Sequence, residues 1–476
     1  MSTNDIAFLS ASETAKAVSE GEATPIEVVE AYLNRIDRLD PDLSAYITVT
    51  REEALGEAEV IAQKIKSGVN PGPLSGVPIA IKDQFWTKGI LTTNGSRIYK
   101  DFVPETDATV VERLRNAGAI LLGKLNLSEL AMGGTQTPAW GIPANPWALD
   151  RTPGESSSGS GVALSAHLCA ASVGEDTGGS GRGPAAYCGV VGMRPTFTRV
   201  SRFGMTHMCW FMDTAAPMTK TVEDCALVLG AIAGYDPRDP YSSCKEVPDY
   251  TQRLNEGISG LRVAVIKELY SNPDMDSDVR SSIANSLDVF KSLGAEIKEI
   301  SIPLVESAGA IFVGIADTEG AGARDEILRE RPFDLDSASR TRLQSAALVP
   351  HKIYNRASKA RVLLRRQFME ALNETDILMS PTSPYPAPLH SSLTARFDSE
   401  EDVRKRFFFR RAYTGCYALT ALPAISIPGG FTKDNLPIGL QLGGAPFSED
   451  LLLRVAYAYE QATSWHTKIA PHAIEM

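Results

Sequence analysis

The sequence predicts an α/β protein that folds as one large domain around a largely buried sheet. From Val77 to the C-terminal helix, short runs rich in β-branched and apolar residues alternate with helical runs, which is typical of this fold class. No internal repeat or low-complexity linker divides the chain. Its 476 residues, 43% of them hydrophobic, are enough to bury a large core.

Residues 1–70 are predicted to form helices that pack on this core. One helix begins with Thr24 as its N-cap and Pro25 at the first helical position. Its apolar residues recur at the spacing of a single buried face, namely Val28, Val29, Tyr32, Leu33, Ile36 and Leu39. A second helix covers residues 51–68 and closes on a glycine.

The remainder, residues 71–476, is predicted to alternate strands with helices. The strands are expected at residues 77–83, 119–126, 261–268, 295–303, 376–382, 423–430 and 437–444. Helices are expected at residues 107–119, 278–294 and 448–463. A long, polar, helical region around residues 305–360 is expected to form a lid or cap that sets substrate specificity.

The balance of charge argues against nucleic acid as a main partner. The formal net charge is −11, whereas binding to phosphates needs clustered lysine and arginine. The basic cluster from Arg404 to Arg411 is interpreted as the solvated edge of a helix, with RNA contact as the alternative.

The chain carries no visible targeting or metal-binding pattern. No signal peptide is apparent at the N-terminus, and no apolar run approaches the roughly 20 residues that span a bilayer. We therefore expect a cytoplasmic protein with no membrane partner. The six cysteines never occur at C-x-x-C spacing, so no metal, cofactor or disulfide framework is expected.

Serine and glycine concentrate in two clusters, "RTPGESSSGSG" from Arg151 and "GEDTGGSGR" from Gly174 to Arg182. Neither matches the glycine patterns of nucleotide-binding loops. The glycines could let the backbone N–H groups of Thr177, Gly178, Gly179 and Ser180 converge on the oxygen of a tetrahedral intermediate, with Ser180 supplying a hydroxyl nucleophile. A plain glycine–serine turn is the alternative.

A serine nucleophile needs a base, and histidine is scarce in this chain. There are six histidines, with neither a G-x-S-x-G nor an H-E-x-x-H motif. A lysine is the usual substitute. Lys82 follows an apolar run, where desolvation would lower its pKa toward the neutral form; a surface lysine is the alternative.

Five segments together carry a family resemblance: "GVPIAIKDQF", "NPWALDRTPGESSSGSGVALSA", "GEDTGGSGRGPAAYCGVVGMRPTFTRVSRFG", "PMTKTVEDCALVL" and "LPAISIPGGFTKDNLPIGLQL". In this order and spacing they resemble the amidase signature family of serine hydrolases over nearly the whole chain. The resemblance implies a mixed, twisted sheet with helices on both faces, and hydrolysis of an amide through an acyl-serine intermediate.

The resemblance also implies the roles of individual residues. Lys82 matches the lysine base, Ser156 the bridging serine that follows a cis peptide bond, and Ser180 the nucleophile. Oxyanion donors are implied at Thr177 to Ser180, and substrate contacts at Met132, Gly133 and Gly134. Asp176 and Arg182 are expected to brace the loop, with a contact between Arg182 and substrate as the alternative.

Two residues depart from the family's glycine-rich pattern, Glu155 and Ser158. Glu155 could place a carboxylate beside Ser156 and stabilise protonated Lys82, or it could point outward. Because three serines are adjacent, Ser157 is the fallback for Ser156.

The substrate is predicted less sharply than the reaction. Met205, Met208, Trp210 and Phe211 could line an apolar pocket, or they could be ordinary core residues. The favoured hypothesis is a stand-alone amidase acting on a small, hydrophobic or aromatic amide, with a homodimer possible. The alternative is the glutaminase subunit of a tRNA-dependent amidotransferase, which passes ammonia to a partner subunit.

Overall fold

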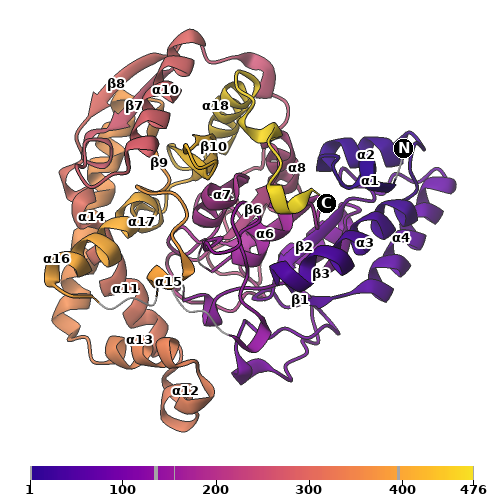
Figure 1. The fold of residues 1–476 in the computed structure, drawn as a ribbon, viewed down its shortest axis with the longest axis horizontal. Coiled ribbons are helices and arrows are strands. Elements are labelled where there is room, and N and C mark those ends of the chain that lie inside the picture. Colours follow the sequence, from indigo (N-terminus) through magenta and orange to yellow (C-terminus); the bar gives the residue numbers. More distant parts are fainter. Residues whose placement is uncertain (1–2, 133–137, 155, 394–396, 475–476) are drawn as a thin grey trace.

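The computed structural model describes residues 3–132, 138–154, 156–393 and 397–474. Figure 1 shows a twisted sheet running through the molecule with helices packed around it. Most central strands are buried along their whole length, including β2 (Pro78–Lys82), β3 (Ile120–Leu125) and β4 (Ala171–Glu175). Strands buried on successive residues must be covered on both faces. The predicted single-domain α/β fold with a mixed sheet is confirmed.

Eleven strands in the described residues form one sheet, in the order β1-β3-β2-β4-β6-β5-β10-β11-β9-β7-β8. Strand β2 runs parallel to β3 and β4, and β7 runs parallel to β8 and β9, whereas the other neighbours are antiparallel. The remaining strands are β1 (Tyr46–Val49), β5 (Val191–Arg194), β6 (Ala215–Thr219), β7 (Arg262–Ile266), β8 (Glu296–Ile300), β9 (Ile377–Pro381), β10 (Ala424–Phe431) and β11 (Pro437–Gly443).

The helices that surround the sheet range from single turns to six turns or more. In chain order they are α1 (Thr3–Ile6), α2 (Ala11–Ser19), α3 (Pro25–Leu43), α4 (Arg51–Lys66), α5 (Thr109–Asn116), α6 (Ser158–Ser165), α7 (Arg182–Cys188), α8 (Val222–Ile232), α9 (Lys267–Tyr270), α10 (Ser277–Ser292), α11 (Ala308–Gly322), α12 (Asp325–Glu330), α13 (Ser337–Ala347), α14 (His351–Glu374), α15 (His390–Leu393), α16 (Glu400–Asp402), α17 (Arg410–Thr420) and α18 (Glu449–Gln461).

The predicted N-terminal helix is confirmed at its start. Thr24 caps α3 by accepting the N–H of Glu27, the Glu27 carboxylate accepts the N–H of Thr24, and Pro25 is the first helical residue. The strand β1 between α3 and α4 was not predicted. It is a short edge strand with one fully buried position, so its sequence carries little alternation.

The two ends of the chain lie on the same side of the molecule, where the first helices meet the C-terminal turn (Figure 1). Arg35 of α3, which is only 2% exposed, donates to three carbonyl oxygens, those of Ala166, His167 and Ala473. Arg35 thus ties the N-terminal helices, the end of α6 and the C-terminal turn together.

The region predicted to be helical consists of α11 to α14. Helix α11 packs against α13, α14 and α17. In Figure 1 these helices lie together at one end of the molecule, away from the N-terminal helices. A π-helical stretch, Val403–Phe409, leads directly into α17. Helices α11 and α17 both reach the loop that follows β4.

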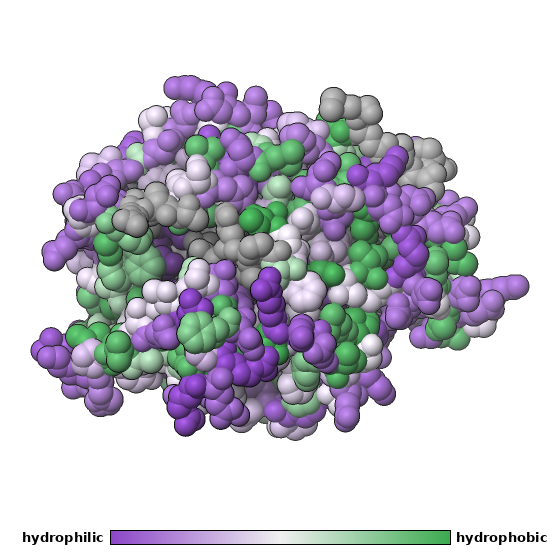
Figure 2. Space-filling view, turned by 60° about the horizontal axis from the view of Figure 1, so that its bottom comes forward, coloured by the Kyte–Doolittle hydropathy of each residue, from purple (hydrophilic) through white to green (hydrophobic). Residues whose placement is uncertain are grey.

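The visible surface carries no continuous apolar band on the face drawn in Figure 2, where hydrophobic residues form separate small groups among polar and charged ones. Within the part of the chain that the structure describes, no helix is both long and apolar enough to cross a membrane.

Candidate active site

The site lies where two parallel strands end side by side. Strand β2 pairs with β4 so that Ile81 is opposite Val173, and the strands end at Lys82 and Glu175. The loop after β4 contains the second serine–glycine cluster and leads into α7. The first cluster leads into α6, which precedes β4. This topology explains why residues about a hundred positions apart meet at the carboxyl edge of the sheet.

Lys82 contacts a serine and a carboxylate inside the protein. Its Nζ lies 2.5 Å from Ser156 Oγ and 3.0 Å from Glu175 Oε2, and all three residues have no exposed surface. Burial lowers the pKa of Lys82, and the negative charge of Glu175 opposes this shift. Burial likewise raises the pKa of Glu175, and the charge of Lys82 opposes it.

The three adjacent serines have different surroundings. Ser156, with a left-handed backbone (φ 47°), is the one that faces Lys82. Ser157 Oγ donates to the carbonyl of Glu175 and accepts its N–H, both at 3.1 Å, so it holds the end of β4. Ser158 is the first residue of α6. Glu155 lies outside the described residues, as does the peptide bond between it and Ser156.

The glycines after β4 are required by close packing. A Cβ atom on Gly178 would lie 2.3 Å from Cζ of Phe312 in α11. One on Gly179, where φ is +120°, would lie 2.2 Å from Oγ1 of Thr414 in α17. Thr414 also donates to the carbonyl of Gly178 at 2.6 Å. The loop is therefore held between two helices and is not merely flexible.

Asp176 and Arg182 form a buried, two-pronged ion pair, with N–O distances of 2.9 and 3.0 Å. Burial by itself would raise the pKa of Asp176, but the charges and hydrogen bonds of Arg182 and Arg194 bring it below its usual range. Asp176 also accepts the N–H of Gly179 at 2.9 Å. That N–H, one of the four expected oxyanion donors, is thus engaged within the loop.

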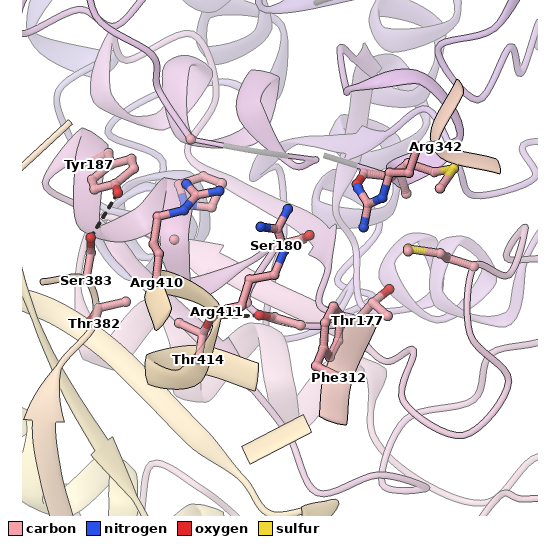
Figure 3. Close-up of a pocket in the computed structure, with 18 residues that line it drawn as sticks. Thr177, Ser180, Tyr187, Phe312, Arg342, Thr382, Ser383, Arg410, Arg411 and Thr414 are labelled. Atoms are coloured by element: carbon pink, nitrogen blue, oxygen red, sulfur yellow. Dashed lines mark hydrogen bonds between the residues drawn. The ribbon is translucent and has the colours of Figure 1, made fainter. Parts of the chain in front are cut away.

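A cavity that is partly open to solvent lies beside this loop. Thr177, Ser180 and both glycines between them line it, with Met132, Tyr187 and Phe312. Polar groups from distant segments complete the lining, namely Arg342, Thr382, Ser383, Arg410, Arg411 and Thr414. Figure 3 shows Arg342 approaching from one side of the cavity and Arg410 and Arg411 from another.

The predicted substrate contacts fall into three groups. Met132 and Met208 line the cavity, whereas Gly133 and Gly134 lie outside the described residues. Met205 is instead a core residue, 4% exposed, and Trp210 is 41% exposed and stacks on Arg202. Met205 thus fits the alternative of an ordinary core residue, and neither Met205 nor Trp210 is among the described residues that line the cavity. Phe211 is not among the described residues that line the cavity; its ring lies 5.8 Å from Arg361.

Several lining residues were missed from the sequence. Phe312 and Arg342 belong to the helical region whose role was predicted without naming residues. Arg410 and Arg411 end the basic cluster that was interpreted as a solvated helix edge, and the structure places both on the cavity wall. The sequence signal that could have indicated these two arginines is the high density of basic residues beside phenylalanines in residues 404–411. Among the described residues, no group of three or more His, Cys, Asp or Glu is placed to hold a metal ion.

Comparison with known proteins identifies the family. A family model described as Amidase matches residues 27–453. The chain belongs to the amidase signature family. This amidase-family chain is 38% identical to the A subunit of the glutamyl-tRNA(Gln) amidotransferase of Carboxydothermus hydrogenoformans, over 97% of its own length and 99% of that protein's.

Solved structures agree with this assignment. One, from a report on a vestigial protein complex and the evolutionary origins of an s-triazine catabolic enzyme, is 32% identical with a TM-score of 0.88, covering 97% of this chain and 99% of that one. The substrate complex of 6-aminohexanoate cyclic dimer hydrolase is 26% identical with a TM-score of 0.89, covering 99% of this amidase-family chain and 100% of that one. The chain is thus an enzyme of a family that acts on C–N bonds.

Proposed function

We propose that the protein hydrolyses a carboxamide through an acyl-enzyme on Ser180, with Ser156 and Lys82 as the proton relay. The observation that carries the proposal is the buried contact between Lys82 Nζ and Ser156 Oγ at the end of β2, beside a cavity that Ser180 lines.

The relay moves protons in both halves of the reaction. Neutral Lys82 takes the proton of Ser156, which takes the proton of Ser180 as its Oγ attacks the amide carbon. Ser156 then returns a proton to the leaving nitrogen, which departs as ammonia or an amine. Lys82 restores the proton of Ser156. Water then attacks the acyl ester and gives its proton to Ser156 as Ser156 gives its own to Lys82, and the relay returns a proton to Ser180 Oγ as the acid is released. Burial supports this role of Lys82 because it favours the neutral amine.

Backbone N–H groups of the loop would stabilise the oxyanion. Gly179 N–H already donates to Asp176, so the proposal relies on the N–H groups of Thr177, Gly178 and Ser180. Asp176 and Arg182 would act as a brace, because their ion pair is fully buried and fixes the start of α7 relative to β4.

The charges around the cavity support an amide that also carries a carboxylate. Three arginines, Arg342, Arg410 and Arg411, line it, and guanidinium groups are well suited to bind carboxylates. Arg342 already donates to both carboxylate oxygens of Asp317. The three arginines favour the alternative drawn from the sequence over a hydrophobic amide. The first candidate substrate is glutamine. The chain would then act as the ammonia-producing component of an amidotransferase, because the relatives are named as A subunits of glutamyl-tRNA(Gln) amidotransferases.

A second candidate is a stand-alone hydrolase of an acidic amide that lacks an ammonium group. The described lining residues include no aspartate or glutamate, whereas the ammonium of glutamine would need such a partner. The monoamide of a small dicarboxylic acid represents this class.

Two experiments test these proposals. A fluorophosphonate probe should label the wild-type protein and fail to label Ser180→Ala, and undiminished labelling of that variant would refute the assigned nucleophile. Ammonia release should then be compared for glutamine, a dicarboxylic monoamide and neutral benzamide. Preference for benzamide would overturn the acidic-substrate proposal.

The same assay separates the two candidate functions. Glutamine-dependent turnover by protein that co-purifies with a second polypeptide would favour the amidotransferase. Turnover of the monoamide alone would favour the hydrolase.

A further inference from the structure

Glu175 is a buried carboxylate in direct contact with the lysine base, and the relay described above gives it no task. It is the last residue of β4 and has no exposed surface. Its Oε2 lies 3.0 Å from Lys82 Nζ, and its Oε1 is hydrogen bonded to Thr177 Oγ1. Ser157 fixes its backbone from both sides. A carboxylate held this rigidly beside the base must affect the protonation of that base.

The hydrogen atoms available in this network do not suffice for two ionised carboxylates. Thr177 Oγ1 contacts both Glu175 Oε1 and, at 2.8 Å, Asp213 Oδ1. The threonine hydroxyl has one proton, so it can donate to only one of the two acids. While both acids are ionised, the other contact therefore lacks a proton, and a proton delivered to one of the carboxyl groups would supply it.

The surroundings of the two acids indicate which one can take a proton more readily. Both oxygens of Asp213 already accept backbone N–H groups, from Met208 at 2.7 Å and from Cys209 at 3.0 Å. The side chain of Glu175 has instead Lys82 and Thr177 as its hydrogen-bond partners. A proton that reaches this network is therefore better accommodated on Glu175 than on Asp213.

We propose that Glu175 is a positioning residue that shares one proton with Lys82, so that the pair acts as a single base for Ser156. In the resting ion pair, Lys82 carries the proton and Glu175 is ionised. Lys82 becomes the neutral amine of the relay when it gives that proton to Glu175, and it then takes the proton of Ser156. One N–H bond breaks as another forms, one O–H bond breaks as another forms, and the site's net charge is unchanged. The inference rests on the relay proposed above.

Other charged groups around the pair come from several elements. Asp176 follows Glu175 directly and is paired with Arg182, while Arg194 of β5 lies close enough to both acids to affect their charges. Asp213 faces the pair from the loop before β6, and His207 Nδ1 lies 3.5 Å from Asp213. Arg324, between α11 and α12, also interacts electrostatically with Asp213. Burial raises the pKa of Glu175, as a proton-sharing partner requires.

A simpler role for Glu175 makes the opposite prediction. If Glu175 only stabilised Lys82 as a cation, its removal would let Lys82 lose its proton at lower pH, and the acid limb of the rate profile would move down. If the pair shares its proton, the acid limb of the wild type reports protonation of the Glu175 carboxylate. Removal of the carboxylate then leaves Lys82 as the only base, and the limb moves up to the pKa of the lysine.

The experiment is the pH dependence of the rate at which a fluorophosphonate labels Ser180, measured from pH 5 to pH 10, because it needs no knowledge of the substrate. Glu175→Gln should move the acid limb up by at least one pH unit, so that its deficit relative to wild type is at least tenfold larger at pH 6 than at pH 9. Glu175→Asp should keep the wild-type limb at a lower plateau. Glu460→Gln, in which a buried glutamate of α18 is replaced, is the matched control and should leave the limb unchanged.

An acid limb of Glu175→Gln that stays in place or moves down would overturn the inference. If that variant fails to fold, Glu175→Asp decides: a limb at the wild-type position supports proton sharing, and a displaced limb refutes it. Wild-type protein that resists labelling, or Ser180→Ala that still labels, would instead refute the proposed nucleophile. The two failures are therefore distinguishable.

Discussion

Gly178→Ala tests whether the glycine loop is positioned by the helix that packs on it. The added Cβ would lie 2.3 Å from Phe312 Cζ and 2.5 Å from Cε2, whereas ordinary van der Waals contact begins at 3.4 Å. The overlap is therefore about 1 Å. Because the Phe312 side chain belongs to a packed cluster and the residue is only 5% exposed, its ring has little room to move away.

The strain has two expected consequences. Overpacking of this kind costs about 1–3 kcal/mol of stability. A loop displaced by about 1 Å should also lose about 100-fold in rate, because Ser180 and the oxyanion donors shift together. The assays are urea-induced unfolding and the rate of fluorophosphonate labelling of Ser180.

A second substitution makes the reasoning specific. Phe312→Leu removes the ring atoms that the new methyl group would strike, so the Gly178→Ala/Phe312→Leu double variant should regain much of the lost labelling rate, with a coupling energy of about 0.5–3 kcal/mol. Gly56→Ala in α4, where nothing lies within 4 Å of the added atom, is the control and should be neutral or slightly stabilising. Strictly additive effects of the two substitutions would refute the account.

Three further predictions concern other parts of the molecule. Ser156→Ala should lower the labelling rate by roughly 10²–10⁴-fold with little change in stability. Ser157→Ala should mainly lower the free energy of unfolding in urea, by about 1–3 kcal/mol, since both hydrogen bonds of Ser157 hold backbone groups. Burial raises the pKa of Glu460 to about 8, so the folded state loses stability as the pH rises from about 4.5 through 8. Glu460→Gln should flatten that decline in unfolding experiments between pH 5 and 9. Arg35→Met should lower the melting temperature by several degrees, because three buried carbonyl groups lose their donor; an unchanged value would contradict that role.

Local patterns predicted the elements that depend on local interactions. The capping residues of α3 and the apolar runs of β2 and β3 are contiguous in the sequence, and the structure has these elements where expected. The resemblance singled out Lys82 and Ser156, which the structure brings into contact. Their roles, and that of Ser180, remain predictions.

The contacts that depend on the tertiary fold could not be predicted in the same way. Glu175 stands in the same quoted motif as Ser180, but its contact with Lys82 follows from the pairing of β2 with β4, which one sequence does not reveal. Glu155, the other acid near a serine, is apparent from the sequence because it is adjacent to Ser156 along the chain, whereas contacts across strands are not apparent. Arg342 and Arg411 reach the cavity from helices about 70 residues apart, and no periodicity marks such an arrangement.

Two parts of the chain form the cavity wall, and they contribute different kinds of groups. Residues 82–180 bring the reacting groups to one sheet edge, while α11, α13 and α17 contribute the side chains opposite them. Gly178 and Gly179 are the seam, pressed against Phe312 and Thr414. Exchanging the helical stretch between relatives should therefore transfer substrate preference while leaving the bond-breaking apparatus intact, provided that the residues touching those two glycines stay as they are. In evolutionary terms, Gly178, Gly179 and the residues that contact them would be the positions least free to vary, and the arginines that line the cavity would be the positions most readily substituted.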